Sequence, residues 1–357
     1  MKLLFYISSM RGGGAERVMS IICNKLVERG HDIYLATNKE HPIVYDLNEN
    51  IKIIDLFVKR SRNKIKNVYK YQKRIRGIAK HVNPDIIITF IWALNAVVIL
   101  ATLGMSIPVI ASEHSTFDKK KSIYEYFVRY YLNRLVDKVT ILTQYDYSFL
   151  GKNLPKKTVV PNPLSYDIYN GNQIRRKNIL AIGSIDRWYI KGFDTLIKIW
   201  REISAKYPGW SLDIVGGGSE DNMKTLKKIA LENNVSNSVR FLGFQKDIDK
   251  LMQQSSIFVL SSRTEGFAMV LAEAMSQGCA SISFDCKAGP NEIITHKKSG
   301  LLIKDQDFEE MKKALICLIE DEELRIQLSL AGRKEVEKFD SNIIVDKWED
   351  IFRELKK

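Results

Sequence analysis

Short apolar runs alternate with segments of helical periodicity along the first 165 residues. The run at 3–7 leads into a glycine-rich loop, SSMRGGG, and then into AERVMSIICNKLVERG, whose apolar residues recur at the spacing of an amphipathic helix. Further apolar runs predict strands at 31–37, 86–90, 108–112 and 139–142. A strand, a glycine turn, a helix and a second strand make a βαβ unit, which binds ligands at the carboxyl end of its strands.

A polar segment with two prolines, PNPLSYDIYNGNQIRRKN (161–178), interrupts this alternation and predicts an interdomain linker. The alternation then restarts, with predicted strands at 178–184, 211–217, 239–244, 256–262, 279–285 and 300–304. We interpret Phe244, at the end of the third of these strands, as a core residue, with stacking on a nucleotide base as the alternative. Two doubly wound domains predict an α/β protein that binds its ligand in the cleft between them. Apolar residues from Ile344 to Leu355 recur at helical spacing and predict an amphipathic helix that needs a partner surface.

Composition narrows the class of protein. Of the 357 residues 45% are apolar, with only 20 glycines and 8 prolines, which excludes a disordered, collagen-like or low-complexity chain. The four cysteines form no CxxC pair and have no histidine at zinc spacing. We therefore expect neither a disulfide framework nor a structural zinc site, and a reducing cytosol fits best. The N-terminal apolar run is too short for the core of a signal peptide.

The longest uncharged stretch covers residues 86–112 and is long enough to span a bilayer. Asn95, Gly104 and Pro108 divide it, and β-branched residues gather at both of its ends. This pattern favours a buried strand, a short helix and a second buried strand over the alternative of a membrane-spanning helix.

The whole net charge of +13 lies in the first half of the chain. Residues 1–165 hold 26 basic and 13 acidic residues, whereas residues 166–357 hold 29 of each. Segment 59–80 contains ten basic and no acidic residues, and a second basic cluster, Lys119–Lys121, precedes a run of aromatic residues. The simplest interpretation is a solvated helix face. The alternative is an anionic partner, either lipid headgroups or nucleic acid, and no nucleic-acid-binding module is recognised in the sequence.

The segment SSRTEGFAMVLAEAMSQG (261–278) combines features of a phosphate site. A predicted strand ends in a short loop with Glu265 and Gly266, and a helix begins near Phe267. Glycine lets a backbone approach a ligand closely, and a helix N-terminus presents unpaired N–H groups to anions. Glu273 follows eight residues after Glu265, so a diphosphate at the helix start would have a carboxylate on each side to hold hydroxyl groups. This arrangement favours a nucleotide-sugar, although acidic residues also occur near helix starts for electrostatic reasons alone.

EGFAMVLAE resembles the E-x7-E motif of glycosyltransferase family 4, which comprises retaining enzymes with the GT-B fold. Seven further segments match the family in order, namely GGGAER (12–17), SEHS (112–115), VPNP (160–163), KGFDTLI (191–197), VGGGSE (215–220), FLGF (241–244) and GPNEII (289–294). The resemblance implies two Rossmann-like domains that face each other across a cleft, with the C-terminal helix packed back on the N-terminal domain. We assign an acceptor-side domain to 1–165, a linker to 166–177, a nucleotide-sugar-binding domain to 178–340 and the returning helix to 341–357.

The resemblance also implies roles for individual residues. Glu265 would contact the transferred sugar, and Glu273 would hold the ribose hydroxyls. Lys191 would bind the diphosphate, and His114 would contact the sugar from the rim of the N-terminal domain. Loop and helix-start residues would complete donor binding through their backbone, namely Gly13, Gly14, Gly216, Gly218, Gly266, Phe267, Ala268 and Met269.

One residue departs from the family pattern. The family has a Gly-Arg pair after the first strand of the second domain, where this chain has Gly183 and Ser184. We assign Arg187 as the substitute for the missing diphosphate-binding arginine. With Lys191 and the helix start to stabilise the departing charge, we expect no metal and no cofactor, and we interpret Asp247–Asp249 as surface acids. The family retains configuration by same-face attack, so we assign no covalent nucleophile.

These inferences predict a retaining glycosyltransferase that uses a nucleotide diphosphate sugar, with UDP favoured over GDP. The basic N-terminal half suggests a lipid-linked saccharide acceptor in cell-surface polysaccharide synthesis. We therefore expect a cytoplasmic protein, peripheral on the inner face of the plasma membrane, that binds no nucleic acid. The alternatives are a nucleotide-sugar epimerase of the same fold and a basic nucleic-acid-binding module. A dinucleotide-dependent dehydrogenase fits poorly, because GGGAER does not complete G-x-G-x-x-G and the second strand ends in Thr37–Asn38 instead of an acid.

Overall fold

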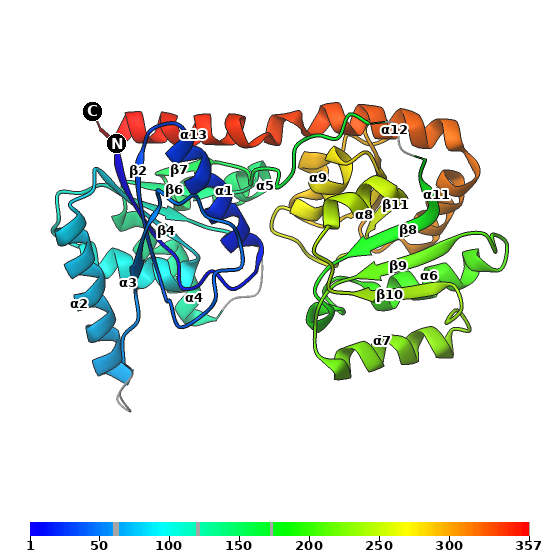
Figure 1. The fold of residues 1–357 in the computed structure, drawn as a ribbon, viewed down its shortest axis with the longest axis horizontal. Coiled ribbons are helices and arrows are strands. Elements are labelled where there is room, and N and C mark those ends of the chain that lie inside the picture. Colours follow the sequence, from blue (N-terminus) through cyan, green and yellow to red (C-terminus); the bar gives the residue numbers. More distant parts are fainter. Residues whose placement is uncertain (60–63, 119–121, 172–173, 357) are drawn as a thin grey trace. The chain divides into compact units, whose positions relative to one another are not determined.

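The computed structural model describes residues 1–59, 64–118, 122–171 and 174–356, and the chain divides into two compact units (Figure 1). Unit 1 comprises Met1–Ser165 and Phe339–Lys357, and unit 2 comprises Tyr166–Lys338. The C-terminal helix thus belongs to unit 1, whereas segment 166–177 belongs to unit 2. The basic cluster Lys119–Lys121 lies outside the described residues.

Unit 1 is built on a seven-stranded parallel sheet with the order β3-β2-β1-β4-β5-β6-β7. Its strands are β1 (Lys2–Tyr6), β2 (Asp32–Thr37), β3 (Lys52–Asp55), β4 (Ile86–Phe90), β5 (Val109–Ser112), β6 (Lys138–Ile141) and β7 (Lys157–Val159). Its helices are α1 (Gly14–Glu28), α2 (Lys64–Val82), α3 (Trp92–Thr102), α4 (Ile123–Tyr130), α5 (Gln144–Leu150) and α13 (Ser341–Leu355). The predicted strands are confirmed here, whereas β3 and β7 were not predicted, because these short edge strands contain no fully buried residue.

The uncharged stretch 86–112 forms β4, α3 and β5, as predicted. Every residue of both strands is buried, since each strand lies inside the sheet with helices on its faces. Within the described parts of the chain, no helix combines the length and the apolar character needed to cross a bilayer.

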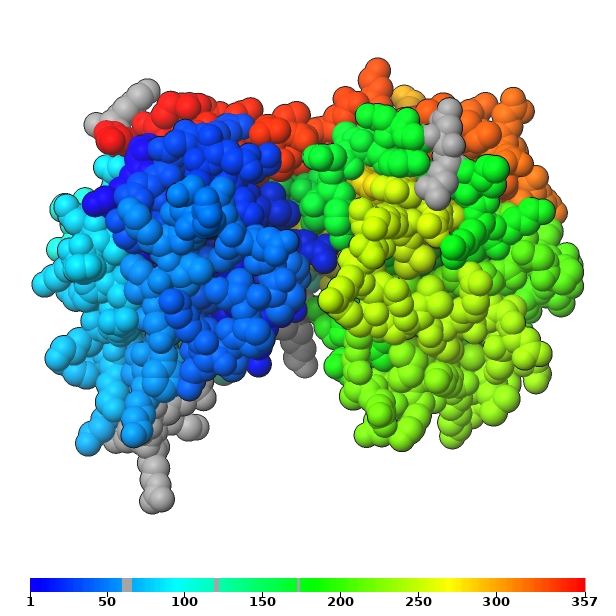
Figure 2. All heavy atoms as spheres, in the orientation of Figure 1, coloured from blue at the N-terminus to red at the C-terminus, as the bar shows by residue number. Residues whose placement is uncertain are grey.

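Helix α13 packs against α1 in unit 1 (Figure 1). Figure 2 shows the last residues, in red, lying over N-terminal residues of this unit, in dark blue. Arg29, which follows α1, donates a hydrogen bond of 2.8 Å to Glu349, and His31 lies 2.9 Å from the same carboxylate. The predicted amphipathic helix therefore buries its apolar side in unit 1 through Ile344, Val345, Trp348, Ile351 and Phe352.

Unit 2 has a six-stranded parallel sheet with the order β10-β9-β8-β11-β12-β13. Its strands are β8 (Arg176–Ile182), β9 (Ser211–Val215), β10 (Val239–Gly243), β11 (Ser255–Leu260), β12 (Ala280–Asp285) and β13 (Leu301–Lys304). Its helices are α6 (Phe193–Ser204), α7 (Glu220–Glu232), α8 (Ile248–Gln254), α9 (Met269–Ser276), α10 (Pro290–Ile293), α11 (Phe308–Glu320) and α12 (Glu322–Glu335). All six predicted strands are present.

The strand order defines one point in each sheet where the connections diverge. In unit 1 the first strand, β1, lies between β2 and β4, and in unit 2 the first strand, β8, lies between β9 and β11. In doubly wound sheets, ligands bind beyond the carboxyl ends of the strands at such a point. We therefore expect ligands to bind at the loops that follow β1 and β8.

Candidate active site

Lys191 and Glu265 lie side by side beyond the carboxyl end of the unit 2 sheet, on the loops that follow β8 and β11. Lys191 Nζ is 2.7 Å from Glu265 Oε1, and the two side chains are 16% and 12% exposed. Ser261 Oγ donates a 2.8 Å hydrogen bond to the carbonyl oxygen of Lys191, which ties the two loops together. A cation and a carboxylate therefore lie together beyond the end of β8, at the position where the chain connections turn to opposite sides of this strand.

Two glycines allow the loop after β8 to approach its neighbours, the loops after β11 and β9. Gly192 adopts φ +67°, and a Cβ atom there would lie 2.0 Å from the carbonyl oxygen of Ser261. Gly216 adopts φ +157°, and a Cβ atom there would lie 1.8 Å from the carbonyl oxygen of Gly183. A larger residue at either position would push the loop after β8 away from its neighbour.

The loops that follow β8 and β9 are joined by Asp186. Its carboxylate accepts hydrogen bonds from the backbone N–H of Ser219 at 2.7 Å and from Asn222 Nδ2 at 2.9 Å. The bond from Ser219 lowers the pKa of Asp186 below its ordinary value. Gly218 packs directly against this turn, since a Cβ atom at Gly218 would lie 2.7 Å from Cβ of Ile185.

Arg187 lies at the end of the same turn and is exposed. Its carbonyl oxygen accepts a 2.9 Å hydrogen bond from the backbone N–H of Lys191, so the two residues sit on one loop. Among the residues that the structure describes, its guanidinium has no hydrogen-bond or ion-pair partner. The structure thus brings Lys191 and Glu265 into contact, and leaves the Arg187 side chain exposed on the same loop as Lys191.

The E-x7-E segment forms the start of α9. The helix begins at Met269, two residues later than predicted, after Ala268 in the left-handed conformation at φ +61°. Phe267 and Ala268 are buried, and Gly289 packs against the backbone of Phe267. Glu273 lies one turn into α9 and is 3% exposed. The segment therefore presents the first N–H groups of a helix next to the loop that carries Glu265.

Three predicted site residues belong to unit 1. Gly13 and Gly14 begin α1, and the hydroxyl of Tyr45 donates a 3.1 Å hydrogen bond to the carbonyl oxygen of Gly13. His114 follows β5, with Nε2 3.0 Å from Ser112 Oγ and its ring centroid 4.3 Å from that of Phe90. Burial lowers the pKa of His114 to about 3, so the imidazole is neutral at pH 7.

A buried ion pair holds the loop around His114 and was not predicted. Arg129 is fully buried on α4, with Nε 2.9 Å from Glu113 Oε2. Its guanidinium donates a 3.0 Å hydrogen bond to the carbonyl oxygen of Thr116 and lies 3.7 Å from the centre of the Phe117 ring. Burial raises the pKa of Glu113, and the charge of Arg129 opposes this shift. Arg129 is therefore a positioning residue for the loop.

Two further observations concern the predicted chemistry of the site. Across the described residues, no group of three or more His, Cys, Asp or Glu side chains is placed to hold a metal ion. Asp247 precedes α8 and is exposed, consistent with a surface acid. The interpretation of Phe244 as a core residue is wrong, because the side chain is 70% exposed beyond the end of β10.

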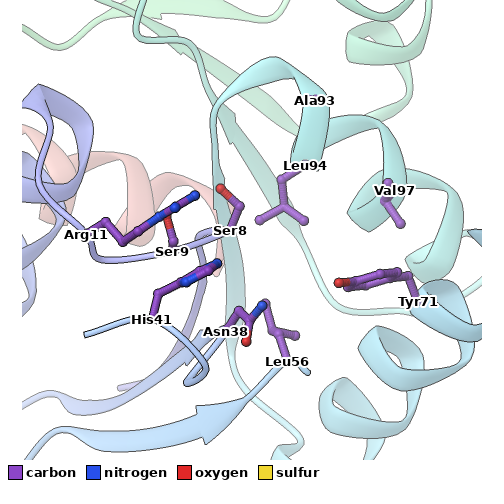
Figure 3. Close-up of a pocket in the computed structure, with 10 residues that line it drawn as sticks. All are labelled: Ser8, Ser9, Arg11, Asn38, His41, Leu56, Tyr71, Ala93, Leu94 and Val97. Carbon is purple, nitrogen blue, oxygen red and sulfur yellow. The ribbon is translucent and has the colours of Figure 1, made fainter. Parts of the chain in front are cut away.

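Unit 1 also contains a cavity of about 320 Å³ that was not predicted (Figure 3). Ten residues line it, namely Ser8, Ser9, Arg11, Asn38, His41, Leu56, Tyr71, Ala93, Leu94 and Val97. They come from the loops after β1, β2 and β3 and from helices α2 and α3. Only the position of these residues in the sequence could have indicated the cavity, since several of them directly follow predicted strands.

Comparison with known proteins relates both units to glycosyltransferases. Residues 12–167 match the family described as glycosyltransferase family 4, and residues 170–335 match glycosyl transferases group 1. An uncharacterized glycosyltransferase of Haemophilus influenzae is 28% identical, over 98% of this chain and 99% of that protein. A Campylobacter jejuni protein, named as an α-1,4-N-acetyl-D-galactosaminyltransferase for a saccharide on PP-undecaprenol, is 24% identical over 100% of this chain and 99% of its own length.

A solved structure shares the fold. HepE of Anabaena, determined in complex with UDP and glucose, superposes with a TM-score of 0.83 at 19% identity, covering 99% of this chain and 100% of that one. The family matches account for both units, and the two parallel sheets have the GT-B arrangement of strands. The chain therefore belongs to the family 4 type of glycosyltransferases with the GT-B fold, which act on nucleotide sugars.

Proposed function

We propose that this protein transfers a sugar from a UDP-sugar to a hydroxyl group of a lipid-linked saccharide, with retention of configuration and without a metal ion. The contact between Lys191 and Glu265 beside the start of α9 carries the proposal, because it places a cation for a diphosphate next to a carboxylate for a sugar. UDP in the HepE structure supports the choice of nucleotide. The PP-undecaprenol-linked substrate in the name of the Campylobacter relative supports the choice of acceptor.

In this proposal the residues of unit 2 act mainly on the leaving group. Breaking the bond between sugar and diphosphate leaves negative charge on the nucleotide and positive charge on the sugar. Lys191, the N–H groups at the start of α9 and the exposed guanidinium of Arg187 stabilise the departing diphosphate. Glu265 contacts the transferred sugar, and Glu273 accepts hydrogen bonds from the ribose hydroxyls. Because Lys191 contacts Glu265 in the structure, the diphosphate takes the place of this carboxylate when the donor binds.

The acceptor hydroxyl attacks the anomeric carbon on the face from which the diphosphate departs. Its proton passes to an oxygen of the leaving phosphate, so that the products are the glycoside and UDP. Retention then needs no covalent intermediate and no carboxylate nucleophile opposite the leaving group. The neutral imidazole of His114 contacts a hydroxyl of the sugar without adding charge to the site.

A basic helix supports a position at the inner face of the plasma membrane. Lys66, Lys73 and Lys80 on α2 are exposed and seven residues apart, so they share one side of the helix, which has no acidic residue. Helix α3 packs against both α2 and α4, and the α4 region exposes aromatic side chains of the kind found at membrane interfaces. These exposed residues are Tyr124, Tyr126, Phe127 and Tyr131.

Removing two of these charges tests the membrane part of the proposal. We expect the double substitution Lys73→Gln and Lys80→Gln to weaken binding to phosphatidylglycerol-containing vesicles by about 2 kcal/mol, or roughly 30-fold, since each basic residue near an anionic surface contributes about 1 kcal/mol. Vesicle sedimentation measures the change. Lys224→Gln with Lys228→Gln, on the exposed face of α7, removes the same charge from unit 2 and is expected to have little effect. Equal vesicle binding by the two double variants would contradict a role for α2.

A donor panel with one substitution tests the catalytic part. We expect UDP-sugars to raise the melting temperature more than GDP-sugars. We also expect Glu273→Gln to weaken UDP binding by roughly 10- to 100-fold in calorimetric titration, because hydrogen bonds to a charged group contribute about 1.5–3 kcal/mol. Glu220→Gln, on the exposed start of α7, is the matched control.

A UDP affinity of Glu273→Gln within twofold of the parent would contradict the assignment of Glu273. Two further results would indicate one of the alternative functions. An epimerase would form product from the donor alone, with no acceptor present. A nucleic-acid-binding module would respond to none of the sugars and would bind RNA or DNA with a steep dependence on salt.

A further inference from the structure

The cavity in unit 1 has the position of a ligand site. It lies beyond the carboxyl ends of the strands, with walls from the loops after β1 and β2 and from α3, the helix after β4. Because β1 lies between β2 and β4, this is the point at which the connections of the unit 1 sheet diverge. Its volume of about 320 Å³ is in the lower range of small-molecule sites. None of the residues assigned above to the donor lines it.

The two walls of the cavity differ in character (Figure 3). Arg11 and His41 lie close together on one wall, from the loops after β1 and β2. Leu94 and Val97 of α3 form the opposite wall, and the hydroxyl of Tyr71 points into the space between the walls. A sugar ring suits such a cavity, because it presents hydroxyl groups at its edge and an apolar C–H face.

The charge of the cavity selects for anions. None of its ten lining side chains is acidic. In the part of the chain that the structure describes, the guanidinium of Arg11 and the imidazole of His41 make no ion pair. Helix α2, which contributes Tyr71, also carries exposed lysines and no acidic residue. An arginine without a carboxylate partner at a cavity binds phosphate or carboxylate groups by charge-assisted hydrogen bonds.

We infer that this cavity binds the acceptor through a sugar ring that carries an anionic group, with Arg11 and His41 as the residues that determine specificity. The inference rests on the proposed function, since it names the class of acceptor for that reaction. The anionic group is a phosphate where the ring is attached to a lipid diphosphate, and a carboxylate where the ring is an acidic sugar. Both share the chemistry that Arg11 recognises, and the experiment distinguishes them.

Saturation-transfer NMR on the full chain provides the test, with excess UDP present to occupy the donor site. The probes are N-acetylglucosamine 1-phosphate, glucuronic acid and uncharged N-acetylglucosamine. We expect at least one anionic probe to bind roughly tenfold more tightly than the uncharged one. Preference for the phosphate identifies the diphosphate-linked ring, and preference for the carboxylate identifies an acidic sugar. Absence of binding by every probe, or equal affinity for charged and uncharged probes, overturns the inference.

Matched variants assign the binding to the cavity. We expect Arg11→Gln and His41→Gln each to reduce the affinity for the anionic probe about tenfold, and Leu94→Trp, which fills the cavity, to reduce binding of that probe further. Lys39→Gln removes an exposed charge beside Asn38, outside the lining, and is expected to leave the affinity unchanged. Parent affinity in both Arg11→Gln and His41→Gln would overturn the assignment. UDP affinity, measured in parallel, reports on unit 2, so failure of the proposed function there is distinguishable from failure of anion selectivity here.

Discussion

Substitution of Lys191 by methionine is expected to lower kcat by about 10²–10³-fold, with a smaller change in the KM for the donor. The diphosphate carries more negative charge as the sugar leaves, so a cation beside it stabilises the transition state more than the bound donor. Removal of one such preorganised group from an active site costs about 2.7–4 kcal/mol in activation free energy. Release of UDP, measured under saturating donor and acceptor, gives kcat directly.

Two further variants make this result specific. Lys198→Met removes an exposed lysine on α6, the helix that follows the Lys191 loop, and is expected to keep the parent kcat. Lys191→Arg retains the charge and is expected to recover part of the activity. The side chains of Lys191 and Glu265 are 16% and 12% exposed, so we expect Lys191→Met to lower folding stability less than loss of Arg129 from its fully buried pair with Glu113. A kcat within threefold of the parent enzyme would remove Lys191 from the mechanism.

Substitution of Arg129 by methionine is expected to destabilise unit 1 by about 3–5 kcal/mol. Arg129 and Glu113 are 0% and 1% exposed, and loss of the arginine would leave a buried carboxylate without its counter-charge. The carbonyl oxygen of Thr116 would lose its hydrogen-bond donor as well. Hydrogen exchange of the β5 and β6 amides in urea, followed by mass spectrometry, measures the change within unit 1.

The double variant Arg129→Met with Glu113→Gln tests the electrostatic origin of this effect. It removes both charges, so we expect it to recover a substantial part of the lost stability. If the single and double variants are equally unstable, the destabilisation comes from lost packing against Phe117 and not from the unpaired carboxylate. A single variant as stable as the parent chain would contradict the buried pair itself.

The sequence predicted the sheets well because most of their strands are buried on both faces. Such strands appear as continuous apolar runs, as in Ile86–Phe90, and each run gives a strand in the structure. The edge strands β3 and β7 escaped prediction because an edge strand has fewer buried positions and needs less apolar character. Phe244 was wrongly predicted to be in the core for a related reason. It is an apolar residue at the end of an apolar run, and the sequence does not show that the chain has already left the core there.

From residue spacing alone, the candidate site was predictable only where its residues lie in one segment, and Lys191 was assigned to it through the family resemblance. The spacing of Glu265 and Glu273 is visible in the sequence, but contact between Lys191 and Glu265 requires the neighbouring positions of β8 and β11. The cavity in unit 1 draws on five separate segments, and serines and leucines in them resemble ordinary loop and core residues. The pairing of Arg129 with Glu113 could not be predicted either, because it depends on how α4 packs against the loop after β5.

Unit 1 consists of two segments that are far apart in the sequence. It therefore cannot be completed during synthesis until α13 has been made. Unit 2 leaves the ribosome whole, whereas the surface beside α1 receives α13 only after the intervening residues 166–338 have been made. At about 5–20 residues per second this takes roughly 9–35 seconds. During that interval the apolar surface that Trp348 and Phe352 later cover is open to water and to chaperones. A chain truncated after Lys338 and released from the ribosome would therefore contain every residue of unit 2 but lack the C-terminal segment of unit 1.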